Sequence, residues 1–117
     1  AALSLLEDAM AQGRAAEDIE LIVRSLTGLT RAAVLRGQPQ NTEAALDEAV
    51  SLARKADMRR LLAEALSVYS EQQAALQQPE RALSLWEEAR KIFTMLHSPQ
   101  AKLEPAWLTS KLTTPTP

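Results

Sequence analysis

The 117-residue chain contains no cysteine and only one histidine, His97. The absence of cysteine excludes disulfide scaffolds, cysteine-ligated zinc, iron–sulfur clusters and thiol nucleophiles. A histidine-based metal site or catalytic triad would depend on His97 alone, and one histidine among scattered carboxylates is a poor ligand set. We therefore expect no metal, no cofactor and no catalytic residue.

Long apolar runs and a large excess of one charge are also missing. No apolar run is long enough to span a bilayer, and no basic stretch precedes an apolar one as in a signal peptide. The net charge is −2 with 24% charged residues, so electrostatics give no reason to expect nucleic acid or a membrane as a partner. The one basic cluster, at Arg54, Lys55, Arg59 and Arg60, is interrupted by Asp57. We expect a cytoplasmic protein.

Glycine and aromatic residues are scarce. Three glycines and four aromatic residues contrast with 21 alanines and 19 leucines. This composition favours helix along nearly the whole chain and predicts an all-α fold of antiparallel helices.

Motifs for catalysis are absent as well. The sequence has no Gly-x-Ser-x-Gly elbow, no Ser-x-x-Lys nucleophile motif and no glycine-rich phosphate loop. Acidic pairs recur at Glu7-Asp8, Asp47-Glu48 and Glu87-Glu88, but a solvated face explains three copies better than three active sites do. We expect that the chain is not an enzyme.

An internal repeat with a period of 40 residues is the strongest signal. The segment 6–10 recurs at 46–50 and at 86–90, and the turn at 37–40 recurs at 77–80. A fixed period of this size is typical of helical-hairpin arrays, in which each hairpin buries its apolar face against the next. We expect a half-repeat over 1–16, repeats over 17–57 and 58–98, a capping helix over 99–112 and a disordered tail over 113–117.

Each full repeat should hold two helices, because apolar residues recur at i, i+4 and i+7. The expected ranges are 19–36 and 42–56, then 58–76 and 79–96. Gly37 would end the first helix, Asn41 or Thr42 would cap the second, and Pro79 suits a first helical turn. Ser98 would cap a following helix, with Pro99 at its first position.

The chain begins within an amphipathic helix that has no capping residue, which is typical of a piece of a longer protein. The apolar stripe of this half-repeat lacks a partner helix, so folding back, dimerisation or the rest of the protein must bury it. The stripe consists of Ala2, Leu3, Leu6, Ala9 and Met10.

The third unit resembles a tetratricopeptide repeat. Leu66, Tyr69 and Ser70 match the large, leucine and small positions of its first helix, and the second helix and the end match at Ala82, Trp86, Ala89 and Pro99. Thr42 departs from the pattern, since alanine is expected there. The 40-residue period is similar to the longer variants in kinesin light chain, spindle-orientation adaptors and the sensor arms of STAND-class regulators. The resemblance implies a short right-handed solenoid that acts as a protein-binding scaffold in a regulatory or adaptor protein.

Tetratricopeptide stacks bind partners on a concave face lined by the first helix of each hairpin. The resemblance therefore places a protein or peptide partner against two helical faces with opposite charge at equivalent positions. Solvated side chains, or ion pairs between the helices, would explain the same pattern. The implied partner-binding residues are Arg24, Thr27, Arg31 and Val34 in the second unit, and Glu64, Ser67, Glu71 and Ala74 in the third.

Trp107 is the one large aromatic residue that the repeat core does not need. It either covers the open end of the stack, as part of the capping helix, or enters a pocket of the partner. The alternative to a peptide-binding scaffold is an assembly module that forms homo-oligomers through its exposed repeat ends.

Overall fold

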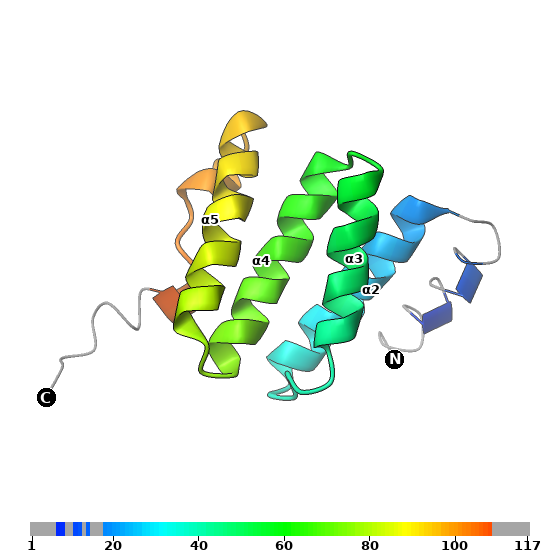
Figure 1. The fold of residues 1–117 in the computed structure, drawn as a ribbon, viewed down its shortest axis with the longest axis horizontal. Coiled ribbons are helices and arrows are strands. Elements are labelled where there is room, and N and C mark those ends of the chain that lie inside the picture. The colour runs from blue at the N-terminus through cyan, green and yellow to red at the C-terminus, as the bar shows by residue number, and fades with distance from the viewer. Residues whose placement is uncertain (1–6, 9–10, 13, 15–17, 109–117) are drawn as a thin grey trace, which may run out of the picture.

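The computed structural model describes residues 7–8, 11–12, 14 and 18–108, and all regular structure within them is helical (Figure 1). The bounds are α2 Ile19–Leu35, α3 Glu43–Lys55, α4 Arg59–Ala75, α5 Pro79–Met95 and the 3-10 helix η1 Pro99–Lys102. The predicted all-α fold is confirmed, and the long helices begin and end within one residue of the expected positions. The expected tail over 113–117 and the apolar stripe of the half-repeat lie outside the described residues.

Short polar or proline signals begin several of these helices. Asp18 caps α2, because its carboxylate accepts from the backbone N–H of Leu21 at 3.1 Å. Thr42 precedes α3, but its hydroxyl donates to the carbonyl of Pro39 at 2.6 Å and caps no helical N–H. Pro79 occupies the first turn of α5, where its missing N–H leaves no hydrogen bond unmade.

All four long helices end in the same way. The residue after each C-cap has a positive φ, which is 73° at Gly37, 54° at Asp57, 62° at Gln77 and 53° at His97. The following N–H donates back to the carbonyl five residues earlier, at 2.8 Å for Gln38 and 2.9 Å for Met58, Gln78 and Ser98. These bonds define a Schellman motif at each end. The sequence period is therefore also a period in backbone conformation.

Two exposed ion pairs follow the same period. Arg14 lies 2.9 Å from Glu48, and Arg54 lies 2.8 Å from Glu88. Both pairs join residues 34 positions apart, and the second pair is the first one shifted by a full repeat. Equivalent residues therefore have equivalent neighbours in space.

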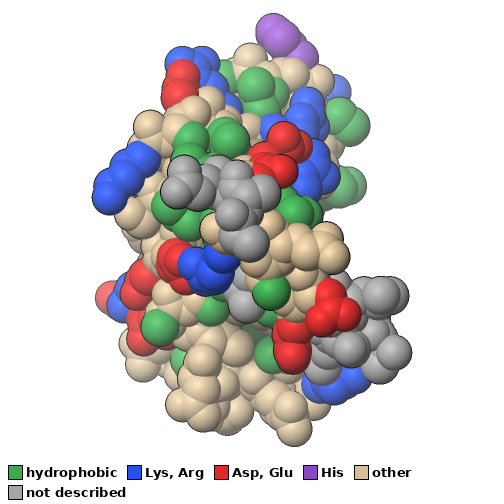
Figure 2. Space-filling model, turned by 90° about the vertical axis from the view of Figure 1, so that its right-hand side faces the viewer, with side chains coloured by type: hydrophobic (Ala, Val, Ile, Leu, Met, Phe, Trp, Pro, Cys, Tyr) green, Lys and Arg blue, Asp and Glu red, His purple; other side chains and the backbone are tan. Residues whose placement is uncertain are grey.

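The hydrophobic core lies between the four long helices. Leu26 and Leu66 are buried at equivalent positions, as are the small residues Ala49 and Ala89, which allow close helix packing. Consecutive helices pack against each other, α2 also contacts α4, and η1 packs against α5. Figure 2 shows the side of the molecule at the right of Figure 1, where acidic, basic and hydrophobic side chains are interspersed.

A polar network centred on Tyr69 joins α3, α4 and α5. The Tyr69 hydroxyl donates to the Asp47 carboxylate at 2.7 Å, and the Glu43 carboxylate is a second acceptor at 3.1 Å. The same hydroxyl accepts from Arg81 at 2.8 Å. The Arg81 guanidinium also lies 5.4 Å from the centre of the Tyr69 ring and 3.3 Å from Glu43. Burial, followed by the hydrogen bond to Asp47, raises the pKa of Tyr69 well above its ordinary value.

The C-terminal segment differs from the capping helix expected over 99–112. Ser98 caps η1 as predicted, accepting from the N–H of Gln100 at 3.3 Å, but η1 ends at Lys102. Residues 103–105 are not helical, residues 106–108 form a further turn, and 109–112 lie outside the described residues. Pro105 explains the break, because proline disfavours helical geometry at the residue before it and removes a helical N–H donor.

Among the described residues, no helix is both long and apolar enough to cross a membrane.

Candidate functional site

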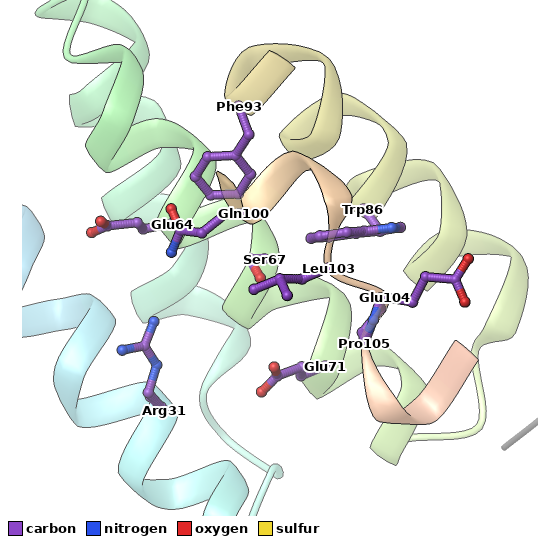
Figure 3. A pocket seen from close by; sticks show the side chains of 10 residues that line it. All are labelled: Arg31, Glu64, Ser67, Glu71, Trp86, Phe93, Gln100, Leu103, Glu104 and Pro105. Carbon is purple, nitrogen blue, oxygen red and sulfur yellow. The ribbon is translucent and has the colours of Figure 1, made fainter. Parts of the chain in front are cut away.

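A pocket of about 220 Å³ lies where α2, α4 and α5 meet the C-terminal segment (Figure 3). Each of these four parts of the chain contributes side chains to it. The lining consists of Arg31 from α2, Glu64, Ser67 and Glu71 from α4, Trp86 and Phe93 from α5, and Gln100, Leu103, Glu104 and Pro105.

The α4 side of the pocket is a polar stripe. Glu64, Ser67 and Glu71 stand at i, i+3 and i+7, so they share one face of the helix. All three are half-buried, whereas the other faces of α4 are buried against α2, α3 and α5. The polar stripe therefore lies on the side of α4 that the neighbouring helices leave open.

Charges of both signs face this opening. Figure 3 shows Glu64 and Glu71 extending from α4 toward α2, from which Arg31 projects. Burial raises the pKa of Glu71, and the positive charge of Arg31 only partly opposes that effect. Within the described part of the chain, Arg31 and Glu71 do not approach within the 4 Å of an ion pair. Among the residues that the structure describes, the Glu71 carboxylate therefore has no direct charged partner.

The opposite wall is apolar. Trp86 and Phe93 are almost fully buried in the core and line the pocket with the little surface that remains exposed. Leu103 lies beside Ser67 in Figure 3 and remains 63% exposed, so it forms a rim of the pocket and not part of its floor. The break at Pro105 keeps this segment extended along the pocket instead of turning away in a helix.

Four of the nine predicted binding residues therefore come together in one pocket: Arg31, Glu64, Ser67 and Glu71. Thr27 is buried, and Val34 and Ala74 are half-buried outside the pocket lining. Trp107 is half-buried and packs against the main hydrophobic core. These four do not line the pocket.

Arg24 lies apart from Arg31, although the two are on one helix. It forms an exposed ion pair with Glu20 at 3.0 Å and shares a separate depression with Arg59 and Arg60. Arg24 therefore neighbours the start of α4, whereas Arg31 neighbours its middle. This order shows that α2 and α4 run in the same direction.

Sequence reasoning missed the pocket residues outside the two first helices. Trp86 and Phe93 belong to the hydrophobic core, and nothing in the sequence pattern distinguishes them from core residues that do not reach the pocket. Gln100, Leu103, Glu104 and Pro105 were expected within a capping helix. Pro105 was the available signal, because a proline at that point predicts an extended return of the chain.

The arrangement offers contacts for binding. It combines carboxylates, a guanidinium, a hydroxyl and apolar surface. Among the described residues, no group of three or more histidine, aspartate or glutamate side chains is placed to hold a metal ion.

A scan against protein-family models and searches of curated proteins and of solved structures find no match to this chain.

Proposed function

We propose that this chain is a non-catalytic protein-interaction module whose pocket between α2, α4 and α5 receives a segment of a partner protein. One observation carries the proposal: Arg31 and Glu71, which occupy equivalent positions in successive repeats, line the same pocket. In a repeat array, a groove along the first helices brings equivalent residues of successive repeats into one pocket.

We also propose that α2–α5 are two hairpins of a short right-handed solenoid of the tetratricopeptide type. The repeated Schellman motifs and the repeated ion pairs support this arrangement. The contact between α2 and α4 is more extensive than any between α3 and α5, as expected if the first helices lie on the inner side of a curve. The pocket then lies on the concave side.

Selection from a display library of random peptides tests the binding proposal. We expect the whole chain to enrich peptides that bind at the pocket, and Arg31→Glu to change the affinity of the selected peptides by about tenfold, because it reverses one charge of the pocket lining. Arg24→Glu is the matched control, because it makes the same charge change on the same helix outside the pocket. Failure to enrich any peptide, or an equal effect of both variants, would contradict the proposal.

Self-assembly is the second candidate, and the exposed apolar residues of α5 favour it. Leu83 is 39% and Met95 is 62% exposed. If α5 formed a dimer interface, light scattering would give a mass that rises with concentration, and Met95→Glu would abolish the rise. The peptide-binding proposal predicts a monomer across the same concentrations.

A further inference from the structure

We propose that the pocket binds one cationic side chain, a lysine or an arginine from an extended partner segment, against Glu71 and Ser67 of α4. This inference rests on the proposed function and adds the chemistry of the partner. It follows from three properties of the pocket, which are its size, its charge and its apolar wall.

The size of the pocket favours one side chain. Clefts for drug-sized ligands occupy roughly 300–1,000 Å³, whereas this pocket holds about 220 Å³. One side of it is the extended segment 103–105, and the other sides are helices. A single long side chain of a bound polypeptide fits this space better than a separate small molecule does.

The charge of the pocket favours a cation. Its lining carries the carboxylates of Glu64 and Glu71 against the one guanidinium of Arg31, while the Glu104 carboxylate extends away from them in Figure 3. Glu71 is half-buried without a direct ion-pair partner among the described residues, and burial raises its pKa. A cation placed beside Glu71 would stabilise its ionised carboxylate, whereas an anion would destabilise it further.

The position next to Glu71 has a second polar group to hold the cation. Ser67 precedes Glu71 by four residues, so their side chains are neighbours on the surface of α4. The Ser67 hydroxyl makes no side-chain hydrogen bond among the described residues, which leaves its oxygen available to accept from an ammonium or guanidinium group. Glu64 stands one turn earlier on the same stripe and supplies further negative charge.

The apolar wall suits the stem of a lysine or arginine. These side chains bury their methylene groups against apolar surface while the charged head stays near polar groups. Trp86, Phe93 and Leu103, which line the same pocket as Glu71, provide that surface (Figure 3). A purely apolar side chain would fill the same wall but would leave the Glu71 carboxylate desolvated and unpaired.

Peptide selection with the whole chain and with Glu71→Lys tests this inference. We expect peptides enriched on the unmodified chain to share a lysine or arginine at one position, and peptides enriched on Glu71→Lys to carry aspartate or glutamate there. Replacing the shared cation by norleucine, which keeps an apolar stem, should weaken binding by about tenfold or more. The relative affinity of the lysine and arginine versions identifies the preferred head group.

Glu87→Lys is the control, because Glu87 is exposed on α5 and lines a different surface depression. This variant should select the same cationic peptides as the unmodified chain. Enriched peptides whose affinity changes with Arg31→Glu but which share no cation would overturn this inference and leave the proposed function standing. No enriched peptide at all would overturn both.

Discussion

The second and third repeats share the bounds of their first helices and their turns, but they differ in the start of the second helix and in the side chains they present. Their first helices have bounds 40 residues apart, and their turns adopt the same Schellman geometry. The matched positions nevertheless hold Leu29 and Tyr69, Arg31 and Glu71, and Leu46 and Trp86. The comparison teaches that the repeat determines where side chains stand, while the pocket depends on which side chains differ between the copies.

Location in the array explains part of this difference. The α4 helix packs against α2, α3 and α5, and its Tyr69 is buried in a polar network. The equivalent Leu29 in α2 is only half-buried. Among the described helices, α2 packs against α3 and α4, one helix fewer than α4 does. The third repeat therefore tolerates substitution less than the second at these positions.

Replacing Trp86 by alanine should have the largest effect. Large-to-small changes of a buried aromatic side chain cost about 3–5 kcal/mol, because they leave a cavity in the core. The matched change Leu46→Ala should cost less, about 2–4 kcal/mol, and should leave the pocket wall intact. Urea unfolding of both variants measures the difference, and equal binding of selected peptides to both would contradict the assignment of Trp86 to the pocket.

Tyr69→Phe should cost about 1–2 kcal/mol at pH 7, because the hydroxyl joins groups from three helices. Since the folded state raises the pKa of Tyr69 above its unfolded value near 10, folding favours the protonated phenol. Its contribution is therefore complete below pH 10 and is lost as the pH rises further. Unfolding free energies of the chain and of Tyr69→Phe should differ by a constant amount below pH 10 and should converge between pH 10 and about pH 12. A constant difference over that range would contradict the network.

The Schellman turns offer a smaller test, since equivalent positions hold Gly37 and Gln77. Gln77→Gly should raise the unfolding free energy by up to about 1 kcal/mol, because glycine adopts a positive φ without the strain of a side chain. Gly37→Ala should lower it by a similar amount, although open space surrounds the position. Thermal unfolding of both variants should show shifts of opposite sign, and shifts of the same sign would show that the turns differ.

Glu71→Gln should have the smallest effect on stability. Unlike a typical substitution, it should raise the unfolding free energy. Because burial raises the pKa of Glu71, its ionised form opposes folding at pH 7, and glutamine removes that cost. We expect a gain of less than about 1 kcal/mol at pH 7 that disappears as the pH falls and the native carboxyl becomes protonated. Denaturant titrations at pH 7 and pH 4 measure both values, and a loss of stability at pH 7 would indicate a favourable ion pair instead.

The sequence alone was sufficient for the helices, because their signals are local. The apolar spacing, Gly37 after the first long helix and Pro79 at the start of the last act within a few turns of the chain, so every long helix was predicted closely. The resemblance to a tetratricopeptide repeat had indicated the residues of the pocket that lie on α2 and α4.

The other half of the pocket depends on long-range packing that no period describes. The C-terminal segment lies across the pocket because Pro105 breaks the helix and the extended chain then returns past α4 and α5. The separation of Arg24 from Arg31 likewise reflects the ion pair with Glu20 and the register between α2 and α4, which spacing within one helix does not reveal.

The most direct test of the central claim measures the register between α2 and α4 with pairs of spin labels. The chain has no native cysteine, so introduced cysteines at positions 24 and 64, and in a second sample at 31 and 71, label cleanly. Two hairpins stacked in one direction predict distances that agree within about 5 Å, one helical pitch, for the two pairs. A larger difference would mean that the first helices do not run side by side, and the shared groove on which the binding proposals depend would not exist.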